Sequence, residues 1–158
     1  MPFKPFFKLI PVAACVSAAL LQGQMSPVLS MAPLPLVKAT RGSVAVVTVR
    51  AALPKGYHAN TNKPTESYLI PMTLKWTSGP LDAQDIQYPK GTMEKYSFSD
   101  KPIVVVTGEF AITTKFKVPA GTAVGPANQT GSLRYQACDD HACYPPKTVA
   151  VAVTVKVE

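Results

Sequence analysis

The sequence contains few of the side chains on which catalytic sites commonly depend. Its 158 residues include only three cysteines and two histidines. It has no nucleophile elbow, no phosphate-binding glycine loop and no C-x-x-C-H haem-attachment motif. A Ser-His-Asp arrangement would have to use His58 or His141, and no surrounding motif supports one. The sequence therefore gives no support to hydrolytic, nucleotide-dependent or haem chemistry.

Charge is also scarce and evenly spread. Charged residues make up 16% of the chain, and the 16 basic residues exceed the 9 acidic ones without forming a run or stripe. A basic stripe is the footprint of nucleic-acid binding, and the aromatic and glycine signature of an RNA-binding sheet is also absent. We therefore predict a solvated surface and no nucleic-acid partner.

Long apolar runs are missing after the first thirty residues, which predicts no transmembrane segment in the mature chain. The beginning of the chain is different. Lys4 and Lys8 precede a short apolar run at residues 9–21, and small and polar residues follow. This order is typical of a cleavable signal peptide. We predict that residues 1–30 are such a peptide and that the protein is exported.

One of the three cysteines lies inside this N-terminal segment. Residues 12–15, VAAC, resemble a bacterial lipobox, so the alternative to simple cleavage is a lipid anchor through Cys15. In either case Cys15 does not take part in the chemistry of the folded domain. That domain then has two cysteines, Cys138 and Cys143.

The pattern over the rest of the chain is that of strands. Helical periodicity is absent, and prolines and glycines supply turn signals at intervals of about ten residues. Apolar positions fall two apart most clearly at Tyr68, Ile70, Met72, Leu74 and Trp76, and Pro71 within this stretch indicates an edge strand or a bulge. The same period recurs at Phe110, Ile112, Thr114, Phe116 and Val118, and at Val149, Val151, Val153, Val155 and Val157. Short strands of this kind, about seven in all, predict an all-β fold built as an antiparallel β-sandwich.

The same signals predict the order of segments. Residues 31–42 contain prolines two positions apart and are expected to be an extended lead-in, with residues 43–158 as the domain. Strands are predicted at residues 43–53, 68–76, 83–89, 103–118, 132–137 and 148–157. Loops are predicted at residues 54–68, 90–102 and 119–131.

The motif richest in chemistry is LRYQACDDHACYPPKT, residues 133–148, in which Cys138 and Cys143 lie five positions apart. It is expected to form a loop between two strands of a rigid scaffold, where functional residues are common. Two thiols this close would form a disulfide in an oxidising compartment. A purely structural bond is one interpretation, although so small a loop gives a chain-entropy stabilisation of only about 2 kcal/mol.

Two further interpretations remain open. A zinc or copper site could use Cys138, Cys143, His141 and, from far along the chain, His58. Zinc sites usually draw four ligands from two clusters, and only one cluster is visible here. Thiol–disulfide exchange would need an accessible sulfur; His141 would stabilise a thiolate, whereas Asp139 and Asp140 would oppose it. The spacing is not C-x-x-C, so a thioredoxin-type pair is not supported.

YQACDDHACYPP resembles the active loop of the N-terminal periplasmic domain of DsbD-type thiol:disulfide interchange proteins. That family has Tyr-Gln, a small residue, cysteine, a short acidic loop, cysteine, an aromatic residue or leucine, and two prolines. GYHANTNKP and YLIPMTL, within residues 56–74, are similar to the family's early loop and strand. YPKG at residues 88–91 resembles its mid-domain turn, so the resemblance extends over residues 37–157.

The resemblance implies an immunoglobulin-like β-sandwich in the periplasm, without a cofactor, whose cysteines alternate between dithiol and disulfide. Cys143 would join partners in mixed disulfides, and Cys138 would resolve them. A cap loop with aromatic side chains would cover the pair. Tyr96 and Phe98 in MEKYSFSD fall at that place, and Tyr144 is assigned to the same partner-binding surface. The alternative for these rings is ordinary packing on the core.

The resemblance also implies the class of partner. A thioredoxin-like domain or a membrane electron-conducting protein would donate electrons, and oxidised periplasmic proteins would accept them. The chain departs from the best-known members in having one residue fewer between its cysteines, and it holds neither of the further domains of full-length members. The alternative function is therefore a non-catalytic binding module with a structural disulfide, or a copper- or zinc-binding periplasmic protein.

Overall fold

The computed structural model describes Met1 and residues 29–158, and every regular element in this part of the chain is a β-strand. The all-β prediction is confirmed. The strands are β1 (Ser30–Met31), β2 (Val37–Ala39), β3 (Val44–Ala52), β4 (His58–Asn60), β5 (Thr73–Trp76), β6 (Asp82–Gln87), β7 (Thr92–Glu94), β8 (Ile103–Thr107), β9 (Glu109–Lys117), β10 (Gly125–Tyr135), β11 (Ala137–Cys138) and β12 (Lys147–Val157). A helix long and apolar enough to cross a membrane is not found in the described residues.

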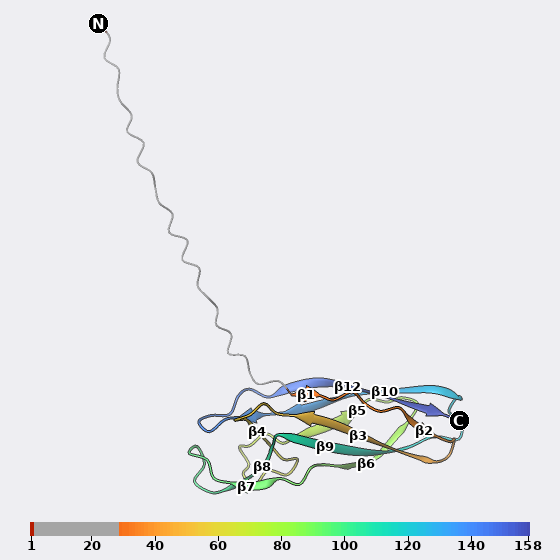
Figure 1. Ribbon diagram of the computed structural model, residues 1–158, viewed down its shortest axis with the longest axis horizontal. Coiled ribbons are helices and arrows are strands. Elements are labelled where there is room, and N and C mark those ends of the chain that lie inside the picture. The colour runs from red at the N-terminus through yellow and green to blue at the C-terminus, as the bar shows by residue number, and fades with distance from the viewer. Residues whose placement is uncertain (2–28) are drawn as a thin grey trace.

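The strands form three sheets. Their orders are β1-β3-β9-β6, β2-β12-β10-β5 and β11-β4-β8-β7. The first two sheets lie one over the other as a sandwich, and the third lies toward the end away from the C-terminus (Figure 1). Every pair is antiparallel except β2 with β12, which is parallel. The predicted sandwich is therefore confirmed, with one parallel pair added at its edge.

The alternating stretches at residues 110–118 and 149–157 form the inner faces of the sandwich. On β9, Phe110, Ile112, Thr114 and Phe116 are buried, and on β12 the valines from 151 to 157 are buried. Thr114 is the one polar residue in the first set, and its Oγ1 accepts a hydrogen bond from Trp76 Nε1 at 3.0 Å. The Trp76 ring meets Phe116 edge-on at 4.9 Å. In these two stretches, period-two alternation identified the core faces correctly.

The prediction of a loop at residues 119–131 is wrong in its second half. β10 begins at Gly125 and pairs with β12 over eleven residues. Its glycines and proline are poor strand formers, but an unbroken ladder with a valine-rich partner outweighs that preference. Gly131 has a packing reason as well, because a Cβ atom there would lie 2.7 Å from Trp76 Cε3.

Three other segment predictions need correction. Residues 54–68 contain β4, and residues 90–102 contain β7, where only loops were expected. The strand predicted at residues 68–76 starts only at Thr73. The amide of Leu69 donates to Glu66 O in a turn, and Tyr68 is exposed, so the alternation before Thr73 does not reflect a strand. β5 is an edge strand, as Pro71 predicted.

The segment before residue 43 contributes to both main sheets. β1 pairs with β3, and β2 pairs with β12. Leu29 is buried, and its amide donates to the Tyr135 hydroxyl at 3.1 Å. Within residues 31–42, which the sequence predicts to be a lead-in, Met31 and residues 37–39 are paired in strands. Cys15 and the apolar run of the predicted signal peptide lie outside the described residues.

Candidate redox site

Cys138 and Cys143 form a disulfide at one end of the sandwich. Cys138 ends β11, the chain turns through residues 139–142, and Cys143 returns opposite it as an isolated antiparallel bridge. Their Cα atoms are 3.9 Å apart. Cys138 is completely buried, whereas Cys143 is partly exposed. Of the two cysteines, Cys143 is therefore the more exposed residue.

Asp139 holds the turn between the two cysteines. Its Oδ1 accepts from the amides of His141 and Ala142 at 2.8 and 2.9 Å, and its Oδ2 accepts from the Tyr144 hydroxyl at 2.7 Å. The bond from Tyr144, followed by the two amide bonds, lowers the pKa of Asp139 to about 2. The same bond raises the pKa of Tyr144 to about 12. An ionised Asp139 thus fixes both the turn and the ring that follows it.

Gln136 connects this turn to the rest of the domain. Its Oε1 accepts from Asn60 Nδ2 at 3.2 Å and from the Ile70 amide at 3.3 Å. Its Nε2 donates to Tyr144 O at 3.1 Å. The Tyr-Gln pair that precedes the cysteines therefore has two structural roles, since Tyr135 binds the N-terminal segment and Gln136 anchors the cysteine loop.

His58 is the residue opposite Cys138. β4 and β11 pair with Cys138 in register with His58. The imidazole is 1% exposed, and its Nε2 has no hydrogen-bond partner among the described residues. Burial lowers the pKa of His58, while the negative charges of Glu94, Asp140 and Asp139 act in the opposite direction. The sequence offered His58 only as a distant metal ligand, so its position beside the cysteine pair is new.

The predicted cap residues lie on His58. The Tyr96 ring stacks on the imidazole with a centroid distance of 3.9 Å, and Phe98 stacks on Tyr96 at 5.4 Å. The Tyr96 hydroxyl donates to Glu94 Oε2 at 2.5 Å, and burial together with this bond raises the Tyr96 pKa. Ser97 Oγ donates to Asp140 O at 2.7 Å. Residues 95–100 form the cap loop, which thus contacts both β4 and the cysteine loop. Figure 1 shows β4 and the cysteine loop at the same end of the molecule.

Tyr144 lies apart from the other two aromatic candidates. Its ring is 6.0 Å from that of Tyr57, tilted by 55°. Its backbone closes the cysteine loop, because the amide of Tyr144 donates to Ala137 O at 2.9 Å. The structure therefore joins Tyr96 and Phe98 in one stack and places Tyr144 in the cysteine loop itself.

The described residues do not assemble a metal site. His141 is exposed, and its Nδ1 lies 3.9 Å from Asp139 Oδ1. No group of three or more His, Cys, Asp or Glu side chains that could hold a metal ion occurs within Met1 and residues 29–158. The zinc or copper interpretation therefore finds no preformed ligand set in this part of the chain.

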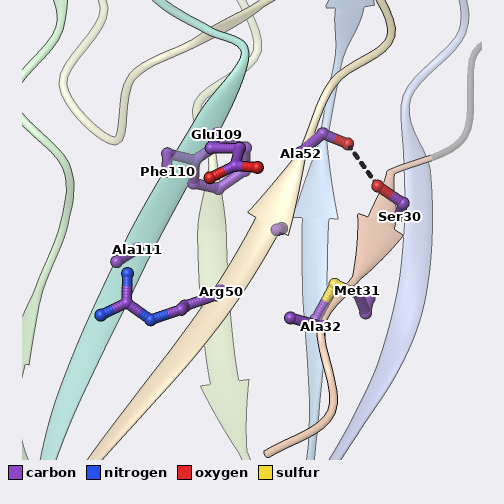
Figure 2. Close-up of a pocket in the computed structure, with 9 residues that line it drawn as sticks. Ser30, Met31, Ala32, Arg50, Ala52, Glu109, Phe110 and Ala111 are labelled. Atoms are coloured by element: carbon purple, nitrogen blue, oxygen red, sulfur yellow. Dashed lines mark hydrogen bonds between the residues drawn. The ribbon is translucent and has the colours of Figure 1, made fainter.

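Two hollows lie near the strands that lead to the site. One of about 450 Å³ is lined by His58, Glu94, Tyr96 and Asp140, with Lys55 among the other lining residues. A second, of about 520 Å³, lies over β1, β3 and β9, and Figure 2 shows Arg50 and Glu109 as its charged side chains. The second hollow is lined by no cysteine, no histidine and no residue of the cysteine loop. Of the two, the first therefore borders the cysteine loop, through Asp140, and it also contains His58.

Comparisons with known proteins agree with this geometry. The model of the family described as "Thiol:disulfide interchange protein DsbD, N-terminal" matches residues 31–155. No curated protein matches the chain. The solved N-terminal periplasmic domain of ScsB from Proteus mirabilis is similar in fold, with a TM-score of 0.53, 11% identity, and coverage of 79% of this chain and 44% of that one.

The seventh ScaB type I cohesin from Pseudobacteroides cellulosolvens has a TM-score of 0.46 and 13% identity, and covers 82% of this chain and 92% of that one. The chain spans less than half of the solved ScsB chain. The likeness to ScsB supports the sandwich fold alone, whereas the family model matches the cysteine loop and most of the described residues. The chain belongs to the family of the N-terminal domain of the thiol:disulfide interchange protein DsbD.

Proposed function

We propose that the chain exchanges electrons with other proteins through the Cys138–Cys143 pair. The observation that carries this proposal is the unequal exposure of the two sulfur-bearing residues, buried at Cys138 and partly exposed at Cys143. Exchange needs one sulfur that a partner can reach and a second that can displace the partner afterwards. Family membership, which implies thiol–disulfide partners in general, supports the same reading.

The proposed reaction proceeds in two displacements. In the reduced protein the Cys143 thiolate attacks a sulfur of a partner disulfide, a mixed disulfide forms, and the partner's other sulfur leaves as a thiolate. Cys138 then attacks the Cys143 sulfur, and the first partner sulfur leaves. The partner disulfide gains two electrons and two protons, and the Cys138–Cys143 dithiol loses the same number. The reverse sequence, with a dithiol donor, restores the reduced protein.

The cap loop and Tyr144 take the remaining roles in the proposal. Tyr96 and Phe98 cover the buried side of the pair through His58, and the bond from Ser97 to Asp140 O holds the cap loop on the cysteine loop. Tyr144, next to Cys143 in the chain, contacts the bound partner. These contacts support a closed state that protects the pair until a partner docks.

The partners and the compartment follow from the same proposal. A thioredoxin-like domain or a membrane electron-conducting protein is the donor, and oxidised periplasmic proteins are the acceptors. Export by a signal peptide within residues 1–30, or a lipid anchor at Cys15, brings the chain to the periplasm. The family description and the partly exposed disulfide support this assignment.

Trapping of mixed disulfides tests the proposed function. In a Cys15→Ser background, Cys138→Ala is expected to accumulate covalent adducts with oxidised exported proteins, because Cys143 attacks and no second sulfur resolves the adduct. The matched variant Cys143→Ala should accumulate far fewer, since Cys138 is buried. Non-reducing gel electrophoresis, with and without prior treatment with dithiothreitol, measures the adducts. Equal trapping by the two variants, or none by either, contradicts the proposal.

The second candidate is a structural disulfide on the same fold, favoured by the hydrogen bonds that fix the loop around Asp139. The reduction potential separates the two functions. Inert structural bonds have potentials below about −300 mV, whereas exchanging pairs lie nearer the potentials of their partners. A potential in the structural range together with no trapped adduct would establish the second candidate.

A further inference from the structure

His58 and Cys138 occupy directly opposite positions on neighbouring antiparallel strands. Cys138 of β11 pairs with His58 of β4, and Ala137 pairs with Ala59. Side chains at such paired positions point to the same face of the sheet, with Cβ atoms about 4.5–5.5 Å apart. The imidazole therefore lies on the face that carries the Cys138 sulfur.

The imidazole is enclosed in a way that structural packing alone does not require. Its ring is stacked beneath Tyr96 and is 1% exposed. Its Nε2 is buried and has no hydrogen-bond partner in the described part of the chain. Buried polar atoms nearly always have a partner, and those that do not call for a reason such as a catalytic role. A phenyl ring could fill the same stack without an unpartnered nitrogen.

Several charged and titratable groups face this imidazole from the surrounding elements. Glu94 comes from β7, Tyr96 from the cap loop, and Asp139 and Asp140 from the cysteine loop. Lys55 lines the hollow that His58 also borders. Burial is the largest influence and lowers the pKa of His58, so the ring is held in its neutral, basic form next to the disulfide.

We propose that His58 is the general base that takes the proton of the Cys138 thiol in the reduced protein. The proposal rests on the proposed exchange function and adds the residue that makes its second displacement possible. Cys138 is buried, and burial in apolar surroundings disfavours a thiolate. A proton acceptor on the same face of the sheet offsets that disadvantage, since the resulting imidazolium stabilises the thiolate by its charge.

The proton and the electrons balance at each step. The proton moves from the Cys138 sulfur to His58 while the partner is still bound to Cys143. The Cys138 thiolate then attacks the Cys143 sulfur, the intramolecular disulfide forms, and the partner sulfur leaves with its electron pair. His58 returns its proton to the leaving thiolate or to water. The imidazole is neutral again, as it is beside the disulfide.

A spectroscopic test requires no variant. The ring resonances of His58 and His141 can be followed by NMR across pH in the oxidised protein and in the protein reduced with a phosphine. We expect the titration of His58 to move to higher pH on reduction, because a Cys138 thiolate favours the imidazolium. An identical His58 titration in both states would overturn the proposal.

A kinetic test separates the two displacements. Dithionitrobenzoate releases one coloured thiolate when Cys143 attacks it and a second when Cys138 resolves the adduct. In His58→Gln the second release should slow by about 3- to 30-fold near neutral pH. Losing the nearby positive charge raises the pKa of the Cys138 thiol by about one to three units, and the greater nucleophilicity of the more basic thiolate offsets about half of the resulting loss in rate. The difference should vanish at high pH, where the thiol ionises without a base. Gln87→Ala, at an exposed position of β6 in another sheet, should keep both rates.

A second substitution guards against loss of structure. His58→Phe retains the stack with Tyr96 and Phe98 but cannot take a proton, so it should show the same slow second release as His58→Gln. A second release at the wild-type rate in His58→Phe would reject the base. Failure of the proposed function is a separate outcome. Cys138→Ala would then trap no partner even where the His58 titration moves on reduction.

Discussion

At the scale of single residues, Asp139 decides the conformation of the cysteine loop. Four residues separate Cys138 from Cys143 in this turn. The Asp139 carboxylate accepts hydrogen bonds from two backbone amides of the turn and from the Tyr144 hydroxyl. Its own amide donates to Ala142 O at 2.9 Å. One side chain therefore fixes both ends of the turn, and its negative charge is stabilised by all three donors.

This arrangement predicts the effect of Tyr144→Phe on Asp139. The Tyr144 hydroxyl is the largest influence that lowers the pKa of Asp139 to about 2, so its removal should raise that pKa toward the ordinary value of 3.8. The two amide bonds remain and should keep the pKa below 3.8. NMR titration of the Asp139 carboxyl carbon measures the change. Tyr68→Phe, which removes a hydroxyl bonded to Ser99, is the control and should have no effect.

The residues of the site were only partly predictable. Cys138, Cys143 and Tyr144 belong to one short motif, and their proximity follows from chain connectivity. Gln136 belongs to the same motif, but its contacts with Asn60 and Ile70 require the folded sheet. His58 could not be placed, because its position opposite Cys138 depends on the pairing of β4 with β11. The paired residues lie 78 and 80 positions apart in the chain (137 − 59 and 138 − 58), and no local pattern specifies such a pairing.

At the scale of elements, predictability followed the length and regularity of the alternation. β3 and β9 bury every second residue along nine positions, β12 does so from Val151 to Val157, and each of these strands was predicted. β4 has only three residues, His58, Ala59 and Asn60, all of them buried. A strand buried on both faces shows no alternation, and these residue types do not favour strands. Its existence depends on the ladders from β8 and β11.

The cap loop is the element whose closure can be tested directly. Phe98 is partly exposed and stacks on Tyr96 and His58, so Phe98→Ala should loosen the cap loop with little effect on the fold. Losing a ring stack of about 0.5–1.5 kcal/mol should speed reduction of the disulfide by dithiothreitol by about 2- to 12-fold. Met93→Ala is the matched control, because Met93 is 69% exposed on β7 outside the stack. Equal reduction rates in both variants would show that the stack does not limit access.

At the scale of the whole molecule, the sandwich is closed by the segment before β3. β1 adds to one main sheet and β2 to the other, so residues 30–39 connect the two layers at their edges. Leu29 packs in the core with β3, β9 and β12 side chains. The hydroxyl of Tyr135, two residues from the cysteine strand β11, accepts the amide of Leu29. The N-terminal segment is thereby connected to the same strand that leads into the redox site.

This connection gives a prediction that distinguishes a lead-in from an integral part of the domain. Leu29 is 4% exposed, whereas Leu36, in the same segment, is 63% exposed. In protein that retains Leu29, Leu29→Ala should lower the free energy of unfolding by about 2 kcal/mol, the low end for a buried leucine, because a terminal segment can shift to reduce the cavity. Leu36→Ala should change it by less than about 0.5 kcal/mol. Urea denaturation measures both values. If the two variants unfold at the same urea concentration, Leu29 does not belong to the cooperatively folded unit.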